Sequence, residues 1–200
     1  MEKIMIVMGT RPEAIKLCPL ILELKKRKRF EVLVCSTGQH RSMLDSVLDA
    51  FRVKPDFDLD VMRTGQTLSS VTSRILKGLD EIFSAEHPNL VIVQGDTTTA
   101  FAGALVAFQK RIPVAHVEAG LRTYHIDSPY PEEFNRQAVG IVSQYNFAPT
   151  EMAKCNLIKE GKNESTIYVT GNTAMLYLLT NSSPEALSHA PFSADRLFGD

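Results

Sequence analysis

The chain has 200 residues, of which 44% are hydrophobic and 22% are charged. This length and composition allow one well-buried core, and they exclude a disordered or fibrous protein. The formal net charge of −1 excludes a broad basic surface of the kind that follows a nucleic-acid backbone. We therefore expect a globular domain without a nucleic-acid partner, in which any anionic ligand is held by a local site.

The three cysteines, Cys18, Cys35 and Cys155, are odd in number and lack the C-x-x-C spacing of a zinc site. This pattern is typical of free thiols in a reducing compartment. The apolar run at residues 4–8 is too short for a signal peptide or a membrane-spanning helix. We expect a soluble, cytoplasmic protein that does not enter a membrane.

Short β-branched or apolar runs predict strands at residues 4–8, 31–35, 90–93, 114–117, 145–148 and 167–169. Helical periodicity predicts helices at residues 13–27, 41–51, 68–83, 98–110, 132–143, 151–159 and 172–179. Because strands alternate with helices, the expected fold class is α/β, with an open, doubly wound parallel sheet. The domain is expected to cover residues 1–180. Residues 181–200 shift to Ser, Pro and Ala, which indicates a linker or the start of a second domain.

Ligands of such a sheet bind at the carboxyl ends of its strands. The first predicted strand is followed by GTRPEAIK at residues 9–16, where a glycine turn leads into a helix that carries Arg11 and Lys16. Backbone N–H groups, the helix dipole and these two cations suit an anion, although a capped helix with both side chains in solvent is equally compatible. The segment lacks G-x-G-x-x-G, so we expect no nicotinamide cofactor.

Acidic residues follow two further strands and begin a helix. Asp96 stands on the turn after residues 90–93, and Glu118 follows residues 114–117. Glu132 and Glu133 occupy the first turn of the helix after Pro131. Asp96 also suits a helix N-cap, and the glutamates also suit the positive end of a helix dipole. Convergence of three carboxylates on one crevice favours acid and base catalysis. Four cations are expected nearby: Arg11, Lys16, Arg122 and Arg136.

The histidines do not fall at paired ligand spacings, so we expect no metal. The sequence also lacks G-x-S-x-G, and neither Cys18 nor Cys35 stands beside a candidate base. A covalent nucleophile of the familiar kinds is therefore not predicted.

Seven segments in this order strongly resemble bacterial non-hydrolysing UDP-N-acetylglucosamine 2-epimerases. They are GTRPEAIK (9–16), TGQHRSMLD (37–45), GDTTT (95–99), HVEAGLRT (116–123), SPYPEEFNR (128–136), APTE (148–151) and VTGNT (169–173). The resemblance runs through residues 4–179, and RPEAIK distinguishes it from the hydrolysing relatives.

The resemblance implies a glycosyltransferase-B-like fold in which the active site lies between two Rossmann-like halves. It implies interconversion of UDP-N-acetylglucosamine and UDP-N-acetylmannosamine, without metal or nicotinamide, through elimination and re-addition of UDP. The implied catalytic carboxylates are Asp96, Glu118 and Glu132. The implied substrate-binding cations are Arg11, Lys16 and Arg136. Which carboxylate serves which face of the sugar stays open.

Some members of the family bind a regulatory UDP-N-acetylglucosamine in a segment that here contains Gln39 and His40, but Ser42 replaces the more usual long Gln or Glu. Family members are about twice this length, which implies that a C-terminal domain completes the nucleotide site. The resemblance also implies that the complete protein is a homodimer. We expect little epimerisation from the 200 residues alone. Two other functions fit the sequence: a nucleotide-sugar glycosyltransferase half-domain, and a non-catalytic nucleotide-sugar-binding or interaction domain.

Overall fold

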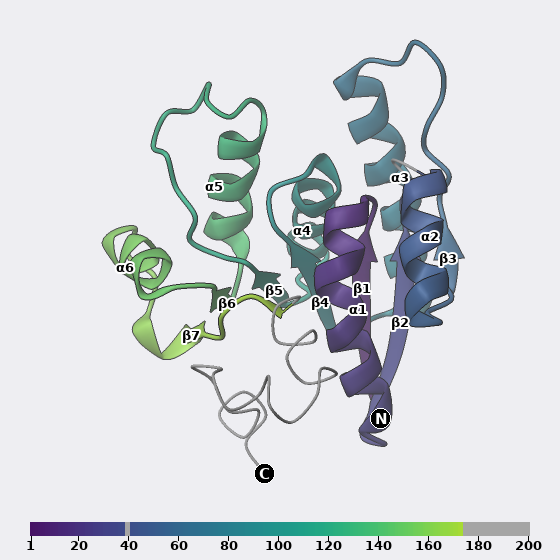
Figure 1. Ribbon diagram of the computed structural model, residues 1–200, viewed down its shortest axis with the longest axis horizontal. Helices are drawn as coiled ribbons and strands as arrows, with labels where there is room; N and C mark the ends of the chain where they lie inside the picture. Colours follow the sequence, from purple (N-terminus) through teal and green to yellow (C-terminus); the bar gives the residue numbers. More distant parts are fainter. Residues whose placement is uncertain (39–40, 174–200) are drawn as a thin grey trace.

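The computed structural model describes residues 1–38 and 41–173 (Figure 1). Within these residues, seven parallel strands form one sheet in the order β3-β2-β1-β4-β5-β6-β7. The strands are β1 (Glu2–Met8), β2 (Phe30–Ser36), β3 (Phe57–Asp58), β4 (Leu90–Gln94), β5 (Val114–Val117), β6 (Tyr145–Ala148) and β7 (Ile167–Val169). The helices are α1 (Arg11–Lys26), α2 (Arg41–Phe51), α3 (Leu68–Glu86), α4 (Thr98–Gln109), α5 (Glu132–Val142) and α6 (Glu151–Lys159), with a 3₁₀ turn at Glu164–Thr166.

Helices cover both faces of the sheet. Helices α1 and α2 pack on one face, where Leu17 and Leu44 join Ile6 of β1 in one apolar cluster. Helices α3, α4 and α5 pack on the other face, where Ile75 lies in a cluster with Val93 of β4. Because both faces of the central strands are covered, β1 and β4 are near-continuous runs of apolar residues. This arrangement is the Rossmann-like, doubly wound α/β fold.

All six predicted strands are confirmed, each within two residues of its expected limits. The two-residue edge strand β3 was not predicted, and α1 begins at Arg11 rather than at residue 13. The predicted helix at residues 172–179 and the predicted linker at 181–200 fall largely or wholly outside the described residues. The expected domain limit at residue 180 therefore stays a prediction.

The chain order places a switch point in the middle of the sheet. From β1 the chain winds outward to β3, and it then returns to β4 and winds the other way to β7. In open parallel sheets, ligands bind outside the carboxyl ends of the strands next to such a switch. The loops after β1, β4 and β5 are therefore where a functional site is expected. None of the described helices combines the length and apolar content needed to cross a membrane.

Candidate active site

The turn after β4 presents Asp96 at the carboxyl edge of the sheet. Thr97, not Asp96, is the N-cap of α4, because its hydroxyl accepts the Ala100 N–H at 3.0 Å. The carboxylate of Asp96 is instead paired with Arg136 of α5, with 2.5 Å between Oδ2 and Nη2. The capping alternative for Asp96 is therefore wrong.

The half-buried carboxyl group of Asp96 lies within electrostatic reach of the other charged residues of this edge. Burial is the largest influence and raises its pKa above the usual range. Arg136 opposes this rise, while the negative charges of Glu118 and Glu132 add to it. Lys16 also lowers the pKa of Asp96. A raised pKa brings a carboxyl group closer to the range in which it exchanges protons near neutrality.

Glu118 follows β5, the strand beside β4, and faces the same edge. Its backbone has φ 65°, a left-handed conformation that is uncommon outside glycine. Its Oε2 accepts hydrogen bonds at 2.5 Å from both Lys16 Nζ and Gln94 Nε2. Lys16 therefore links α1 to the end of β5, and the site draws on three consecutive positions of the sheet.

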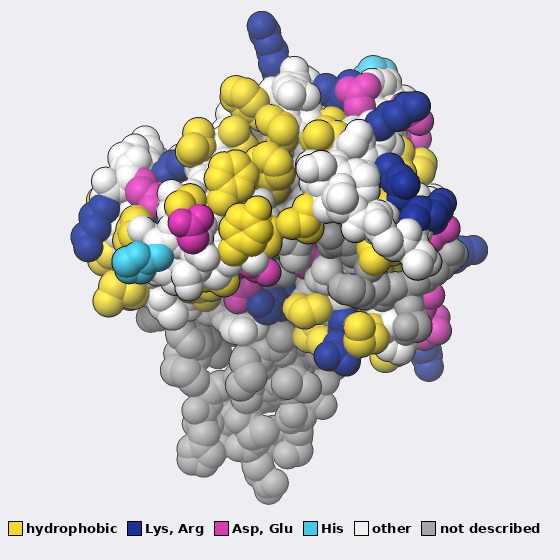
Figure 2. Space-filling model, turned by 90° about the horizontal axis from the view of Figure 1, so that it is seen from above, with side chains coloured by type: hydrophobic (Ala, Val, Ile, Leu, Met, Phe, Trp, Pro, Cys, Tyr) yellow, Lys and Arg dark blue, Asp and Glu magenta, His cyan; other side chains and the backbone are white. Residues whose placement is uncertain are grey.

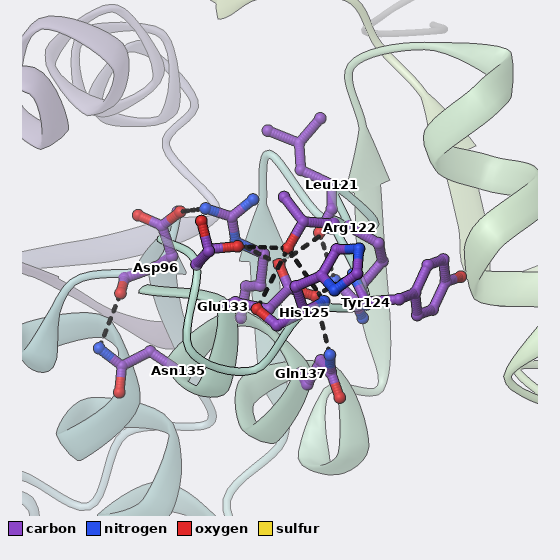
Figure 3. Close-up of polar contacts among 12 residues, drawn as sticks. Asp96, Leu121, Arg122, Tyr124, His125, Glu133, Asn135 and Gln137 are labelled. Atoms are coloured by element: carbon purple, nitrogen blue, oxygen red, sulfur yellow. Dashed lines mark hydrogen bonds and ion pairs between the residues drawn. The ribbon is translucent and has the colours of Figure 1, made fainter. Parts of the chain in front are cut away.

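The two glutamates at the start of α5 have different surroundings. Glu133 is fully buried and accepts hydrogen bonds from the backbone N–H groups of Thr123 and Tyr124 and from Gln137 (Figure 3). Burial alone raises the pKa of Glu133, but these hydrogen bonds together hold it below its usual range. Glu132 is half-buried and has no hydrogen-bond or ion-pair partner among the described residues. The structure thus assigns Glu133 to holding the loop and leaves Glu132 free for other contacts.

The N-terminal end of α1 is partly capped by a side chain of the same helix, Glu13. The fully buried Glu13 accepts the backbone N–H groups of Gly9 and Thr10, at 2.8 and 2.7 Å. Its other oxygen accepts the hydroxyl of Thr97 at 2.6 Å, which ties the loop after β1 to the loop after β4. These two N–H groups, which precede the first residue of α1, are therefore not available to an anion, and an anion site at the first turn of α1 itself stays a prediction. The exposed Arg11 has no ion-pair partner in the described part of the chain, so its side chain remains available.

Arg122 was expected beside the carboxylates, and this expectation is wrong. Its guanidinium forms a two-point ion pair with Glu160, at 2.7 and 2.8 Å, and its side chain has no exposed surface. Glu160 follows α6, so this pair joins the loop after β5 to α6. Arg122 therefore has a structural role away from the acidic cluster.

Three buried polar residues around the site were not singled out from the sequence. Gln94 binds Glu118, His116 Nε2 lies 2.7 Å from the carbonyl oxygen of Gly95, and Asn135 donates to the carbonyl of Asp96 at 2.8 Å. A polar residue within an otherwise apolar strand was the available signal for Gln94, which ends β4, and for His116, which lies inside β5. The suggested regulatory residues Gln39 and His40 lie outside the described residues. Within residues 1–38 and 41–173, no three His, Cys, Asp or Glu side chains group as a metal site would require.

The cluster has the parts that proton transfer at carbon needs. Asp96 and Glu118 each have one oxygen bound by a cation, while Asp96 Oδ1 and Glu118 Oε1 accept no hydrogen bond from the described residues. Two carboxylates at neighbouring strand ends, with Glu132 beside them, can therefore take up and release protons. Lys16, Arg136 and the unpaired Arg11 supply positive charge for an anionic group.

Comparison with known proteins gives a consistent result. The profile of the family described as UDP-N-acetylglucosamine 2-epimerase matches residues 22–195. The UDP-N-acetylglucosamine 2-epimerase of Bacillus subtilis (strain 168) is 57% identical over 173 residues, which cover 86% of this chain and 46% of that protein. The chain thus spans about half the length of the curated relatives it matches.

Solved structures agree with the sequence comparison. The UDP-GlcNAc 2-epimerase from Neisseria meningitidis, bound to UDP-GlcNAc, superposes with a TM-score of 0.84 at 46% identity, covering 93% of this chain and 52% of that one. The enzyme from Methanocaldococcus jannaschii, in complex with UDP-GlcNAc and UDP, has a TM-score of 0.83 at 39% identity, with coverage of 93% and 52%. The domain corresponds to the N-terminal half of their glycosyltransferase-B-like fold. On these matches of sequence and structure, the chain belongs to the UDP-N-acetylglucosamine 2-epimerase family.

Proposed function

We propose that the chain is the catalytic half of an enzyme that interconverts UDP-N-acetylglucosamine and UDP-N-acetylmannosamine. The observation that supports it most is the pairing of two strand-end carboxylates with cations: Asp96 with Arg136, and Glu118 with Lys16. Family membership, and the UDP-GlcNAc bound to the relative from Neisseria meningitidis, support the choice of substrate.

The proposed reaction moves a proton on and off C2 of the sugar. One carboxylate removes the C2 proton as the bond from C1 to the diphosphate breaks, which yields a 2-acetamidoglucal and UDP. The reverse addition returns UDP to C1 while a second acid delivers a proton to the opposite face of C2. Asp96, Glu118 and Glu132 supply the acid and base groups, with their individual faces unassigned. Arg11, Lys16 and Arg136 offset the charge that develops on the departing diphosphate.

A direct test uses the two-domain enzyme, by which we mean these residues followed by a C-terminal half like that of the relatives. Incubated with UDP-N-acetylglucosamine, it is expected to form UDP-N-acetylmannosamine, detected by proton NMR, and to reach the same mixture from either substrate. The 200-residue chain alone is expected to show little or no turnover, because positioning of the diphosphate is shared with the other half. If the folded two-domain enzyme binds the nucleotide sugar without turnover, the non-catalytic alternative is correct. Family membership already disfavours the glycosyltransferase alternative.

We also propose that the two-domain enzyme is a homodimer that associates through one apolar face. A cavity of about 890 Å³ opens between α3, α4 and α5, and its lining includes Leu68, Phe101, Tyr130 and Phe134. Leu68 and Phe134 are 50% and 47% exposed, and hydrophobic side chains gather in a patch when the molecule is seen from above (Figure 2). Exposed apolar patches of this kind mark protein interfaces.

The dimer is tested by sedimentation of two matched variants. Leu68→Asp places a charge on the apolar face, in a first helical turn where an acidic residue is favourable to the monomer. Met152→Asp makes the same change in the first turn of α6, where Met152 is 70% exposed and does not line the cavity. We expect Leu68→Asp to sediment as a monomer and Met152→Asp as a dimer. A wild-type two-domain enzyme that is monomeric at micromolar concentration would refute the proposed dimer.

We also propose that the protein is cytoplasmic, because its three cysteines are free, as is usual in a reducing compartment.

A further inference from the structure

Two buried side chains hold the backbone on both sides of Asp96. The carbonyl of Gly95 accepts a hydrogen bond from His116 Nε2 at 2.7 Å. The carbonyl of Asp96 itself accepts one from Asn135 Nδ2 at 2.8 Å (Figure 3). His116 is fully buried, and Asn135 is 4% exposed. The two carbonyls belong to the peptide groups that flank the α-carbon of Asp96. Holding both therefore fixes the direction in which the Asp96 side chain leaves the backbone.

The turn needs such support because its own backbone is permissive. Gly95 has φ 68°, in the left-handed region that glycine enters freely. Its N–H donates to the carbonyl of Val117 at 2.9 Å, which ties the turn to the end of β5 but leaves both flanking carbonyls to other partners. His116 and Asn135 are those partners, one from β5 and one from α5.

The chemistry of each side chain suits this role. A carbonyl oxygen only accepts, so His116 holds the Gly95 carbonyl with its Nε2–H. Burial lowers the pKa of His116 to about 4, so the imidazole keeps one protonation state through the neutral range. Asn135 lies on the helix that also carries Glu132 and Arg136, and its amide therefore sets the position of that helix against the Asp96 turn.

We propose that His116 and Asn135 are positioning residues that aim the Asp96 carboxylate at the reacting carbon. The proposal rests on the proposed function, in which Asp96 takes part in proton transfer. Displacement of a catalytic group by about 1 Å can cost on the order of 10²-fold in rate. Loss of either donor should therefore lower kcat while the substrate contacts that govern KM remain.

The test replaces each donor in the two-domain enzyme with apolar side chains. His116→Leu, His116→Phe, Asn135→Leu and Asn135→Ala are each expected to lower kcat by roughly 10- to 100-fold, with KM within about threefold of wild type. His116→Gln restores an N–H donor and is expected to recover most of the lost kcat. Two substitutions are made at each position so that at least one variant is expected to fold. The comparison is made only among variants that unfold in one cooperative transition.

Asn146 is a matched control. It pairs in register with His116 on the adjacent strand β6, it is fully buried, and its side-chain amide has no hydrogen-bond partner among the described residues. Asn146→Leu changes a buried polar side chain at the same depth without touching the Asp96 turn. Its kcat is expected to equal that of wild type, whatever happens to its stability.

A second measurement does not depend on catalysis. In the 200-residue chain, hydrogen exchange of the Gly95 amide, followed by NMR, is expected to be at least about tenfold faster in the His116 and Asn135 variants, and unchanged in Asn146→Leu. An inactive wild-type two-domain enzyme would refute the proposed function, and the exchange measurement would still decide whether the turn is held as proposed. If kcat and Gly95 exchange stay within threefold of wild type in the folded variants at both positions, the positioning role is wrong.

Discussion

Asp96 on the turn after β4 is paired with Arg136 in the second turn of α5, with 2.5 Å between Oδ2 and Nη2. The pair joins the centre of the sheet to the helix that begins with Glu132. It also opposes the effect of burial, because the positive charge of Arg136 lowers the pKa of Asp96 while burial raises it. Arg136 is therefore expected to set the pH range over which the Asp96 carboxyl group ionises.

Arg136→Gln in the two-domain enzyme tests this relationship. In the direction of the reaction in which Asp96 removes the C2 proton, it works only when ionised, so the rate falls as the pH falls through the pKa of Asp96. Removal of Arg136 removes a charge that lowers this pKa, and the acid limb of the kcat/KM profile in that direction should move to higher pH. Lys154→Gln, which breaks the exposed pair with Glu164, is the control and should leave the limb in place. An acid limb that stays fixed or moves to lower pH in Arg136→Gln would contradict the expected coupling.

Glu132 and Glu133 are expected to differ in what they contribute to stability. Glu133→Gln weakens a buried set of hydrogen bonds to the loop at residues 123–124 and should lower the free energy of unfolding by roughly 1–3 kcal/mol. Glu132→Gln alters a residue without described partners and should change it by less than about 0.5 kcal/mol. Urea unfolding of the 200-residue chain measures both. Equal losses in the two variants would show that the structural division between them is wrong.

The lowered pKa of His116 predicts that the folded chain loses stability in acid. Burial lowers its pKa from 6.5 to about 4 in the folded chain. Between these values the unfolded chain binds a proton that the folded chain does not, so the free energy of unfolding falls as the pH falls through this window. The contribution of neutral His116 to the free energy of unfolding is fully present above pH 6.5, and roughly 3 kcal/mol of it is lost by pH 4.

The His116→Gln variant isolates this contribution, since glutamine does not titrate. The difference in unfolding free energy between wild type and variant, measured in urea at pH 7.5, 6.0 and 5.0, should shift in favour of the variant as the pH falls. Carboxylate titration is common to both proteins and cancels in the difference. A difference independent of pH would mean that His116 binds protons equally in the folded and unfolded chains, and it would contradict the lowered pKa.

The fold was predictable because buried parallel strands leave a strong signal. Strands such as β1 and β4 are apolar along most of their length, since helices cover both of their faces. The edge strand β3 has only two residues, Phe57 and Asp58, too few for any periodicity. Its position is set by pairing with β2, a contact that local sequence does not encode.

The edge on which the carboxylates lie was also predictable, because the position after a parallel strand determines it. The partners of the individual charges were not. Arg122 and Arg136 both stand near acidic residues in the sequence. The packing of the folded chain determines that Arg122 pairs with Glu160 and that Arg136 pairs with Asp96. Glu132 and Glu133 are adjacent and identical in type, and the turn of α5 alone decides which one is buried. His116 and Asn135 donate hydrogen bonds to backbone carbonyls. A residue pattern does not show which carbonyl a side chain will reach.

The central claim is that Asp96, Glu118 and Glu132 move the C2 proton of a UDP-linked sugar. It is tested most directly by exchange of that proton for deuterium in UDP-N-acetylglucosamine, followed by NMR in the two-domain enzyme. Wild type is expected to exchange it, and Asp96→Asn, Glu118→Gln and Glu132→Gln are each expected to lower the rate of catalysis by on the order of 10²–10⁴ with little change in the thermal midpoint. A variant that retains exchange but loses net epimerisation would identify the residue that serves the opposite face of the sugar. Exchange at the wild-type rate in all three variants would show that the carboxylates are structural and that the proposed mechanism is wrong.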